Sequence, residues 1–447
     1  MVKNKKQNLQ EGIFDARELG TPKMILLGLQ HTFAMFGATV LVPMITGLDI
    51  STTLLMAGLG TLLFHFITKG KVPAFLGSSF AFLGGYAAIA PKIILENGQE
   101  VANVEMLPYA CLGVASAGVI YLILALFIKS FGVKRVMKFF PPIVTGPIII
   151  AIGLSLAGTA VNSAKTNWPL ALIALSVIVI CNIWGKGMIK IVPILIGIVV
   201  SYIAAILMNV IDFTPVIEAS WFGSPIKSEA LVFGNVKDLS LAISAVIAIA
   251  PIALATIMEH IGDISAISST TGKDFISEPG LHRTLIGDGL ATTMASLFGG
   301  PANTTYGENT GVLALTKVYD PRVIRIAACF AIFFSISPKF AALINTIPSA
   351  IVGGVSFVLY GMISAIGIRN LVENHVDFSK SRNLIIAAVI LVTALGGVTI
   401  AINDTASLSS LAIASIAGII LNSIFPGEDY EKLAEENEAP KGNTYNV

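Results

Sequence analysis

Charge is what this sequence has least of. Only 12% of its 447 residues are Asp, Glu, Lys or Arg, whereas 55% are hydrophobic; a soluble domain carries about 25% charged residues. So little charge cannot cover the surface of a soluble domain, which excludes a soluble globular protein. The formal net charge of +1 gives no bulk field that would attract nucleic acid or an acidic partner. The composition therefore predicts a channel, a transporter or a membrane enzyme.

Cysteine is scarce as well. Cys111, Cys181 and Cys329 lie in separate apolar stretches, without the spacing of a metal site. They are interpreted as packing residues, so neither a disulfide nor a metal cluster is expected. A cleavable signal peptide is not expected either, because the first apolar run, 24–46, is too long for one. No Ser-His-Asp order, metal-ligand set or nucleotide-binding domain is visible, so we do not expect an enzyme.

Long apolar runs fill most of the chain. Crossing the hydrocarbon layer takes roughly 20 residues per helix, and fourteen runs are bounded by Gly, Pro or charge: 24–46, 51–68, 74–91, 107–128, 140–158, 168–184, 191–210, 239–262, 284–299, 303–316, 323–337, 341–366, 383–400 and 406–424. The third and tenth are short and interrupted by Gly or Pro. The predicted fold class is an all-α polytopic membrane protein with fourteen transmembrane segments.

The positions of the basic residues test this count. With a cytoplasmic N-terminus, all but five of the 28 Lys and Arg residues fall in inside segments, and the five outside are Lys92, Lys165, Lys227, Lys237 and Lys339. Cytoplasmic loops carry such an excess, and one missed or extra span would scramble it. We therefore expect a multi-pass protein of the cell membrane, with a cytoplasmic N-terminal tail over 1–23 and an acidic cytoplasmic tail over 425–447.

The two halves of the chain resemble each other. His31 in the first span is followed 42 residues later by Pro73 at the start of the broken third span, and His260 in the eighth is followed 41 residues later by Pro301 at the start of the broken tenth. Since seven spans per half is an odd number, the halves must have opposite orientations. We predict an inverted repeat, with 24–210 as its first unit and 239–424 as its second.

Broken helices at matching places of an inverted repeat indicate a transporter site at the bilayer midplane. The third and tenth spans should therefore face each other. Each is expected to have a short extended stretch, 75–80 in one and 303–306 in the other, followed by a half-helix whose free N–H groups point at the cavity.

Placing a carboxylate inside a membrane span costs free energy, so each one is a candidate functional residue. Glu259 and Asp263 stand at i and i+4 on the eighth span, hence on one face. One of two carboxylates so placed should hold a proton near neutral pH, and that proton can be coupled to ligand binding. Glu308 begins the half-helix of the tenth span, where a negative charge complements the helix dipole. Purely structural roles remain open for all three.

Other polar residues in the spans have two interpretations each. His31 is either a hydrogen-bonded core residue or a proton relay, and Asn309 either caps the half-helix or bonds backbone opened by the break. For Asp288, a hydrogen bond between helices is favoured over a role in proton transfer. His260 points about 100° away from Glu259 and is a weaker candidate.

The residue types at the breaks suggest a ligand. Carboxylates accept hydrogen bonds from N–H donors, while half-helix N–H groups, as at Phe80 and Gly307, donate to carbonyl oxygens. The rings of Phe80, Tyr306 and Tyr360 would cover a flat face. A small planar lactam with alternating N–H and C=O groups fits these features, whereas carboxylates would repel an inorganic anion.

Four stretches resemble the nucleobase–ascorbate transporter family, its bacterial uracil permeases above all: 30–38, 73–82, 259–262 and 304–317. The resemblance runs from about 24 to 421, and Tyr306-Gly307-Glu308-Asn309 is its most specific part. It implies a core domain of spans one to four and eight to eleven, a gate domain of spans five to seven and twelve to fourteen, proton-coupled uptake and a homodimer.

The resemblance also implies roles for individual residues. The substrate-binding residues would be Glu259 and Glu308 on ring nitrogens, the amides of Phe80 and Gly307 on carbonyl oxygens, Tyr306 and Ala38 along the site, and Ser356 and Tyr360 from the gate. Glu259, Asp263 and His31 would serve proton coupling, with Asn309 and Ser79 supporting the site. The proton would be the coupling ion, with no metal and no other cofactor.

Two positions bear on the substrate. Glu308 favours uracil, since purine-transporting relatives often have Gln there, but Asp263 stands where some uracil permeases carry His and purine relatives often carry Asp. The expected function is proton-coupled uptake of uracil by alternating access, with nucleobase and lipid as partners and no nucleic acid. Alternatives are a xanthine or urate permease of the same family, or an anion exchanger of the same 7+7 design. The exchanger predicts a basic residue at the half-helices, and neither 73–90 nor 301–316 contains one.

Overall fold

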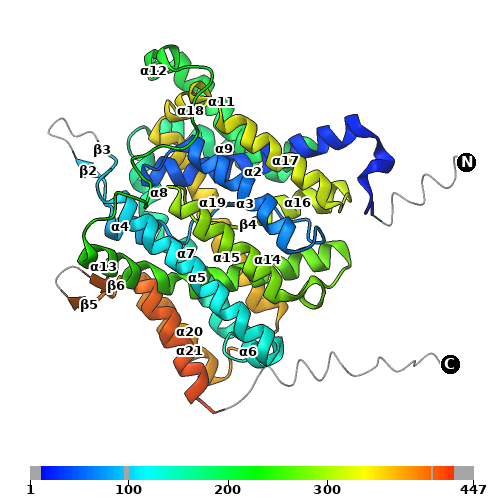
Figure 1. Cartoon of the computed structure of the whole chain (residues 1–447), viewed down its shortest axis with the longest axis vertical. Coiled ribbons are helices and arrows are strands. Elements are labelled where there is room, and N and C mark those ends of the chain that lie inside the picture. The colour runs from blue at the N-terminus through cyan, green and yellow to red at the C-terminus, as the bar shows by residue number, and fades with distance from the viewer. Residues whose placement is uncertain (1–11, 95–99, 404–405, 427–447) are drawn as a thin grey trace, which may run out of the picture.

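The computed structural model describes residues 12–94, 100–403 and 406–426, and the chain is mainly helical over them (Figure 1). The predicted acidic tail lies outside the described residues except for its first two, and so does the N-terminal tail up to residue 11.

The first half of the chain supplies the elements η1 (Ala16–Leu19), α2 (Thr21–Thr46), α3 (Ile50–Ile67), β1 (Leu76–Ser78), α4 (Leu83–Ile89), β2 (Ile93–Ile94), β3 (Glu100–Val101), α5 (Leu107–Phe131), α6 (Val133–Met137), α7 (Pro142–Ser155), α8 (Ala157–Ala164), α9 (Trp168–Trp184), α10 (Met188–Ile191) and α11 (Pro193–Leu207). The helix α12 (Thr214–Glu218) belongs to the connection between the halves.

The second half supplies α13 (Leu239–Ile249), η2 (Ala250–Ile252), α14 (Ala253–Thr271), η3 (Ile276–Gly280), α15 (Leu281–Leu297), β4 (Asn303–Thr305), α16 (Gly307–Thr316), α17 (Pro321–Ser335), α18 (Pro338–Asn345), α19 (Ser349–Glu373), α20 (Ser381–Leu395), β5 (Ile400–Asn403), β6 (Ala406–Leu408) and α21 (Ser410–Ile424). The two hairpins β2–β3 and β5–β6 lie on the same side of the molecule, at the left of Figure 1.

Six helical stretches of the described chain are long and apolar enough to cross a membrane: Thr21–Thr46, Ile50–Ile67, Leu107–Phe131, Pro142–Ala164, Leu239–Thr271 and Ser349–Glu373. Five shorter apolar helices accompany them, at Phe80–Ile89, Trp168–Trp184, Pro193–Leu207, Ser381–Leu395 and Ser410–Ile424. A multi-pass membrane protein is thereby supported, while the count of fourteen spans and the inverted repeat stay predictions.

One predicted run is placed differently. The expected span 341–366 is divided at Pro348, which precedes the first residue of α19. The residues before it form α18, which bends by 87° from α17. The physical reason is that proline lacks a backbone N–H and restricts the preceding residue to extended conformations. The prediction of a continuous helix from 341 was therefore wrong.

The helices pack in two sets. The first comprises α2, α3, α5, α13, α14, α15, α16 and α17, and the second comprises α7, α8, α9, α11, α19, α20 and α21. Glycine permits the close packing of α5 on α15, because a Cβ at Gly118 would lie 2.6 Å from the carbonyl oxygen of Gly289. Small residues let helix backbones approach in this way within a bilayer.

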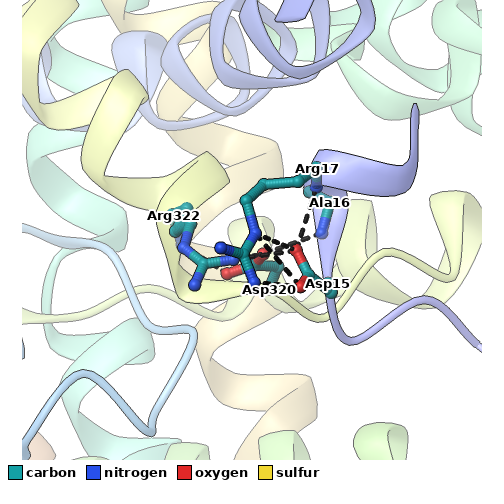
Figure 2. Close-up of polar contacts among 5 residues, drawn as sticks. All are labelled: Asp15, Ala16, Arg17, Asp320 and Arg322. Atoms are coloured by element: carbon teal, nitrogen blue, oxygen red, sulfur yellow. Dashed lines mark hydrogen bonds and ion pairs between the residues drawn. The ribbon is translucent and has the colours of Figure 1, made fainter. Parts of the chain in front are cut away.

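The segment before α2 is docked on the turn between α16 and α17. Ile13 pairs with Val318 as a parallel bridge, and Figure 2 shows the carboxylate of Asp15 facing the guanidinium groups of Arg17 and Arg322. The distance from Arg322 Nη1 to Asp15 Oδ1 is 2.8 Å. The N-terminal segment is thus attached to the far end of the helix that begins at the tenth break.

Candidate functional site

The third and tenth spans meet at a two-stranded antiparallel sheet near the centre of the molecule (Figure 1). Leu76 of β1 lies opposite Thr305 of β4, and Ser78 lies opposite Asn303. Each strand leads into a helix, β1 into α4 and β4 into α16. This confirms the prediction that the two interrupted spans face each other through extended stretches.

The non-helical backbone at this depth is satisfied by neighbouring side chains. The hydroxyl of Thr61 lies 2.9 Å from the amide nitrogen of Leu76 and 3.2 Å from its carbonyl oxygen. A ring nitrogen of His65 contacts the carbonyl of Ala74 at 2.9 Å, and in the other direction the side-chain amide of Asn303 on β4 donates to the carbonyl of Met56 in α3 at 2.8 Å. Unpaired backbone groups in lipid cost several kcal/mol each, so polar residues of α3 are structural here.

Tyr306 connects the two broken spans. It precedes α16 as the N-cap residue, and its hydroxyl donates to the carbonyl of Ser78 at 2.9 Å. Its ring fills the space beside Gly77, where an added Cβ would lie 2.5 Å from two ring carbons and 2.8 Å from Thr39 Oγ1. Tyr306 therefore holds the two half-spans together and is also a candidate residue lining the site.

The predicted carboxylates converge on the beginning of α16. Glu259 and Asp263 lie on α14 and are half-buried, and half-buried Glu308 stands in the first turn of α16. A Cβ at exposed Gly307 would be 3.8 Å from Asp263 Oδ1, so the two helices face each other here. Oε2 of Glu259 is buried and has no hydrogen-bond partner among the described residues. The arrangement leaves carboxylate acceptors beside the free N–H groups of a helix N-terminus.

A buried polar network lies behind these carboxylates. The hydroxyl of Thr305 donates to Asp263 Oδ2 at 2.8 Å and lies 3.5 Å from His260 Nδ1. His260 Nδ1 is in turn 2.7 Å from Asp288 Oδ2, and both side chains are fully buried. The contact confirms that Asp288 bonds between helices, α15 to α14. Sequence reasoning missed Thr305 and gave His260 little weight, because their partners lie on other elements.

Asn309 and His31 contact each other across α16 and α2. Asn309 Nδ2 donates to the carbonyl oxygen of His31 at 3.2 Å and lies 3.1 Å from its Nδ1. His31 is 1% exposed. Both residues thus hold the half-helix against α2, and the ring of His31 takes part in this contact.

The structure places the remaining predicted site residues on β1–α4, α2 and α19. The rings of Phe80 and Tyr360 meet edge to face with centroids 6.0 Å apart, although they come from the third span and from α19. Ser356 lies one turn before Tyr360 and is buried, as is Ala38 on α2. The buried hydroxyls of Ser79 and Tyr360 have no hydrogen-bond partner in the part of the chain that the structure describes. They are polar atoms with capacity for a ligand or water.

Carboxylate acceptors, a helix N-terminus and aromatic rings thus surround the two paired half-spans of a multi-pass membrane protein. Residues 22–402 match the profile of the xanthine/uracil permeases, described as the Permease family. The "Uracil permease" of Bacillus caldolyticus is 43% identical over 426 residues, which cover 93% of this chain and 95% of that protein. That of Escherichia coli (strain K12) is 40% identical over 412 residues, covering 90% and 91%. The chain belongs to the nucleobase–ascorbate transporter family and is a transporter, not an enzyme.

A solved structure has the same overall fold. The transmembrane domain of the cyanobacterial bicarbonate transporter BicA superposes with a TM-score of 0.60, covering 92% of this chain and 98% of that one, at 14% sequence identity. At this identity the likeness concerns the fold alone.

Proposed function

We propose that this chain takes up uracil across the cell membrane in symport with protons. The observation that carries the proposal is the convergence of Glu259 and Glu308 on the N-terminus of α16, beside the β1–β4 pair. The similarity to proteins named uracil permease, at 43% and 40% identity, supports the choice of substrate.

Uracil presents a flat ring with alternating N–H and C=O groups, and the site offers the complementary set. The carboxylates of Glu259 and Glu308 would accept from the ring N–H groups. The backbone N–H groups of Phe80 and Gly307 would donate to the carbonyl oxygens, aided by the positive end of the helix dipole. The edge-to-face rings of Phe80 and Tyr360 would enclose the flat face. An isolated anion would meet the carboxylates and be repelled.

Proton coupling is proposed for the carboxylates on α14. A proton on Glu259 or Asp263 reduces the repulsion among the three neighbouring carboxylates, which favours loading of a neutral ligand. Each proton that moves down a membrane potential of 100 mV supplies about 2.3 kcal/mol. That free energy can sustain a roughly 50-fold concentration ratio of uracil across the membrane. His31 is a further candidate in coupling through its contact with Asn309 on α16.

Alternating access is proposed as motion between the two helix sets. The set around α3, α5 and α15 would be the core, spans one to four and eight to eleven, and the set around α7, α9 and α19 would be the gate. Fourteen spans in an inverted repeat, cytoplasmic termini and a homodimer belong to the same proposal. The excess of Lys and Arg in the predicted inside segments supports the orientation.

The experiment is uptake of radiolabelled uracil into proteoliposomes with an imposed pH gradient, acidic outside. We expect accumulation that a protonophore abolishes and that Glu308→Ala liposomes lack. Uptake by the wild-type protein that is indifferent to both the gradient and the protonophore would contradict symport.

Two rival substrates are tested by competition in the same assay. Asp263 favours the purine alternative, xanthine or urate, since purine-transporting relatives often carry Asp there. The similarity in fold to a bicarbonate transporter suggests an anion as the alternative substrate. The absence of basic residues in 73–90 and 301–316 argues against an anion. Unlabelled uracil should compete at micromolar concentration, and bicarbonate should not compete. Absence of labelled-uracil uptake together with uptake of labelled xanthine by the same proteoliposomes would reverse the choice of substrate.

A further inference from the structure

We propose that Thr305 is a positioning residue that transmits the protonation of Asp263 to the half-helix on which the nucleobase would bind. The inference rests on the proposed proton-coupled function and adds a specific residue to it. Thr305 is 2% exposed and is the last residue of β4. Its hydroxyl donates to Asp263 Oδ2 on a different helix at 2.8 Å.

The position of Thr305 in the chain connects it to the site. Tyr306, the next residue, is the N-cap of α16, and Glu308 follows in the first turn. The amide of Tyr306 also donates to the carbonyl of Phe75 on the opposing half-span at 3.0 Å. A change in how Thr305 is held therefore reaches both the half-helix and the strand pair through covalent and hydrogen bonds.

The hydrogen bond at Thr305 depends on the proton at Asp263. An ionised carboxylate can only accept, so the hydroxyl must donate to it. A protonated carboxyl can donate, in which case the Thr305 oxygen accepts and its hydrogen must turn elsewhere. His260 Nδ1, at 3.5 Å, does not accept that hydrogen, because its single in-plane site is engaged with Asp288 at 2.7 Å. Only the ionised form of Asp263 therefore obliges the Thr305 hydroxyl to donate to it, so the hold of Asp263 on Thr305 changes with the proton.

The surroundings of Asp263 contain few other titratable groups. They are Glu259 and His260 on the same helix, Asp288 on α15, Glu308 on α16 and Tyr121 on α5. The elements α7, α21, η2 and β4 also contact α14 and supply no titratable side chain, and η3 supplies only Glu278, which is exposed and paired with Lys71. Thr305 is the group that joins the carboxylate of Asp263 to the strand leading into α16.

The test compares Thr305→Val, which keeps the shape and removes the hydroxyl, with Thr305→Ser, which keeps the hydroxyl. The Kd of uracil is measured between pH 5.5 and 8.5, and uptake is measured as concentrative accumulation and as uracil counterflow, which needs no net proton movement. We expect Thr305→Ser to retain the wild-type pH dependence. Thr305→Val should flatten the pH dependence at least threefold and lose at least tenfold in accumulation, while counterflow persists.

The outcomes separate this inference from the function on which it rests. Wild-type uptake that ignores the pH gradient would overturn the proposed function itself. Coupled wild-type uptake together with an unaltered pH profile in Thr305→Val would overturn the role of Thr305. A uniform weakening of binding at every pH would likewise mark Thr305 as merely structural. If Thr305→Val does not fold, Thr305→Cys, a weaker hydrogen-bonding group, should flatten the profile to an intermediate degree, and a wild-type profile would refute the role.

Discussion

Gly77 lies where the two half-spans approach each other closely, and Gly77→Ala perturbs that contact through the ring of Tyr306 without changing the proposed carboxylate and amide ligands. The added Cβ would lie 2.5 Å from two ring carbons of Tyr306 and 2.8 Å from the hydroxyl oxygen of Thr39. The ring cannot swing aside freely, because its hydroxyl is bonded to the carbonyl of Ser78 at 2.9 Å. Restoring ordinary contact distances requires the strands to separate by about 1 Å. Overpacking of this kind costs about 1–3 kcal/mol.

That cost should appear in ligand binding, because Tyr306 directly precedes the residues at the start of α16. We expect uracil to bind roughly 5- to 150-fold more weakly to Gly77→Ala, measured by ligand-induced thermal shift and labelled-uracil uptake. The matched control is Gly311→Ala on the same half-helix, whose Cβ would meet no described atom within 4 Å; it should bind normally and unfold at an equal or higher temperature. Normal uptake by Gly77→Ala, or equal losses in both variants, would refute the close-contact argument.

Three further predictions concern single side chains. Glu308→Ala should weaken uracil binding roughly 10- to 150-fold while the variant still purifies as a folded protein, since it removes a charged acceptor worth about 1.5–3 kcal/mol; retained affinity would show that the site is misplaced. Tyr360→Phe removes a buried hydroxyl without a described partner, so the melting temperature should hold or rise while the Kd of uracil rises up to about tenfold; a lowered melting temperature with unchanged Kd would contradict this. The hydrogen bond from Arg17 holds the pKa of Asp15 well below its usual range, so the stabilisation by this ion pair is present above the ordinary pKa of about 4 and is lost only as the pH falls through the lowered value. Backbone amides over 13–19 should therefore be equally protected from hydrogen exchange at pH 5 and pH 8, and Asp15→Asn should lose that protection. Protection that vanishes by pH 6 would refute the ion pair.

The sequence predicts the centre of this molecule well, because breaks in helices have chemical signatures. Proline and glycine interrupt the third and tenth runs, and the structure forms its strand pair at those interruptions. The carboxylates Glu259 and Asp263 share a face because the period of a helix places i and i+4 together. Local rules of this kind place residues along one element and on one side of it.

Contacts between elements are what the sequence does not reveal. The pairing of His260 with Asp288 depends on how α14 and α15 are rotated about their axes, and neither residue's neighbours in sequence indicate it. The same holds for Thr305 and Asp263. The docking of Asp15 on Arg322 joins residues 307 positions apart, in a polar stretch without any periodic pattern.

The strand pair at the centre also imposes an order on biosynthesis. Tyr306 follows Ser78 by 228 residues, which a ribosome making 5–20 residues per second needs roughly 10–45 s to add. Throughout that interval the extended backbone of β1 is in the nascent chain without the strand that later pairs with it, in a medium that penalises unpaired amides. Pairing of β1 with β4 can therefore be completed only after the second half of the protein has been made. Substitutions in β4 are expected to reduce the amount of protein in the membrane as well as the activity of each molecule.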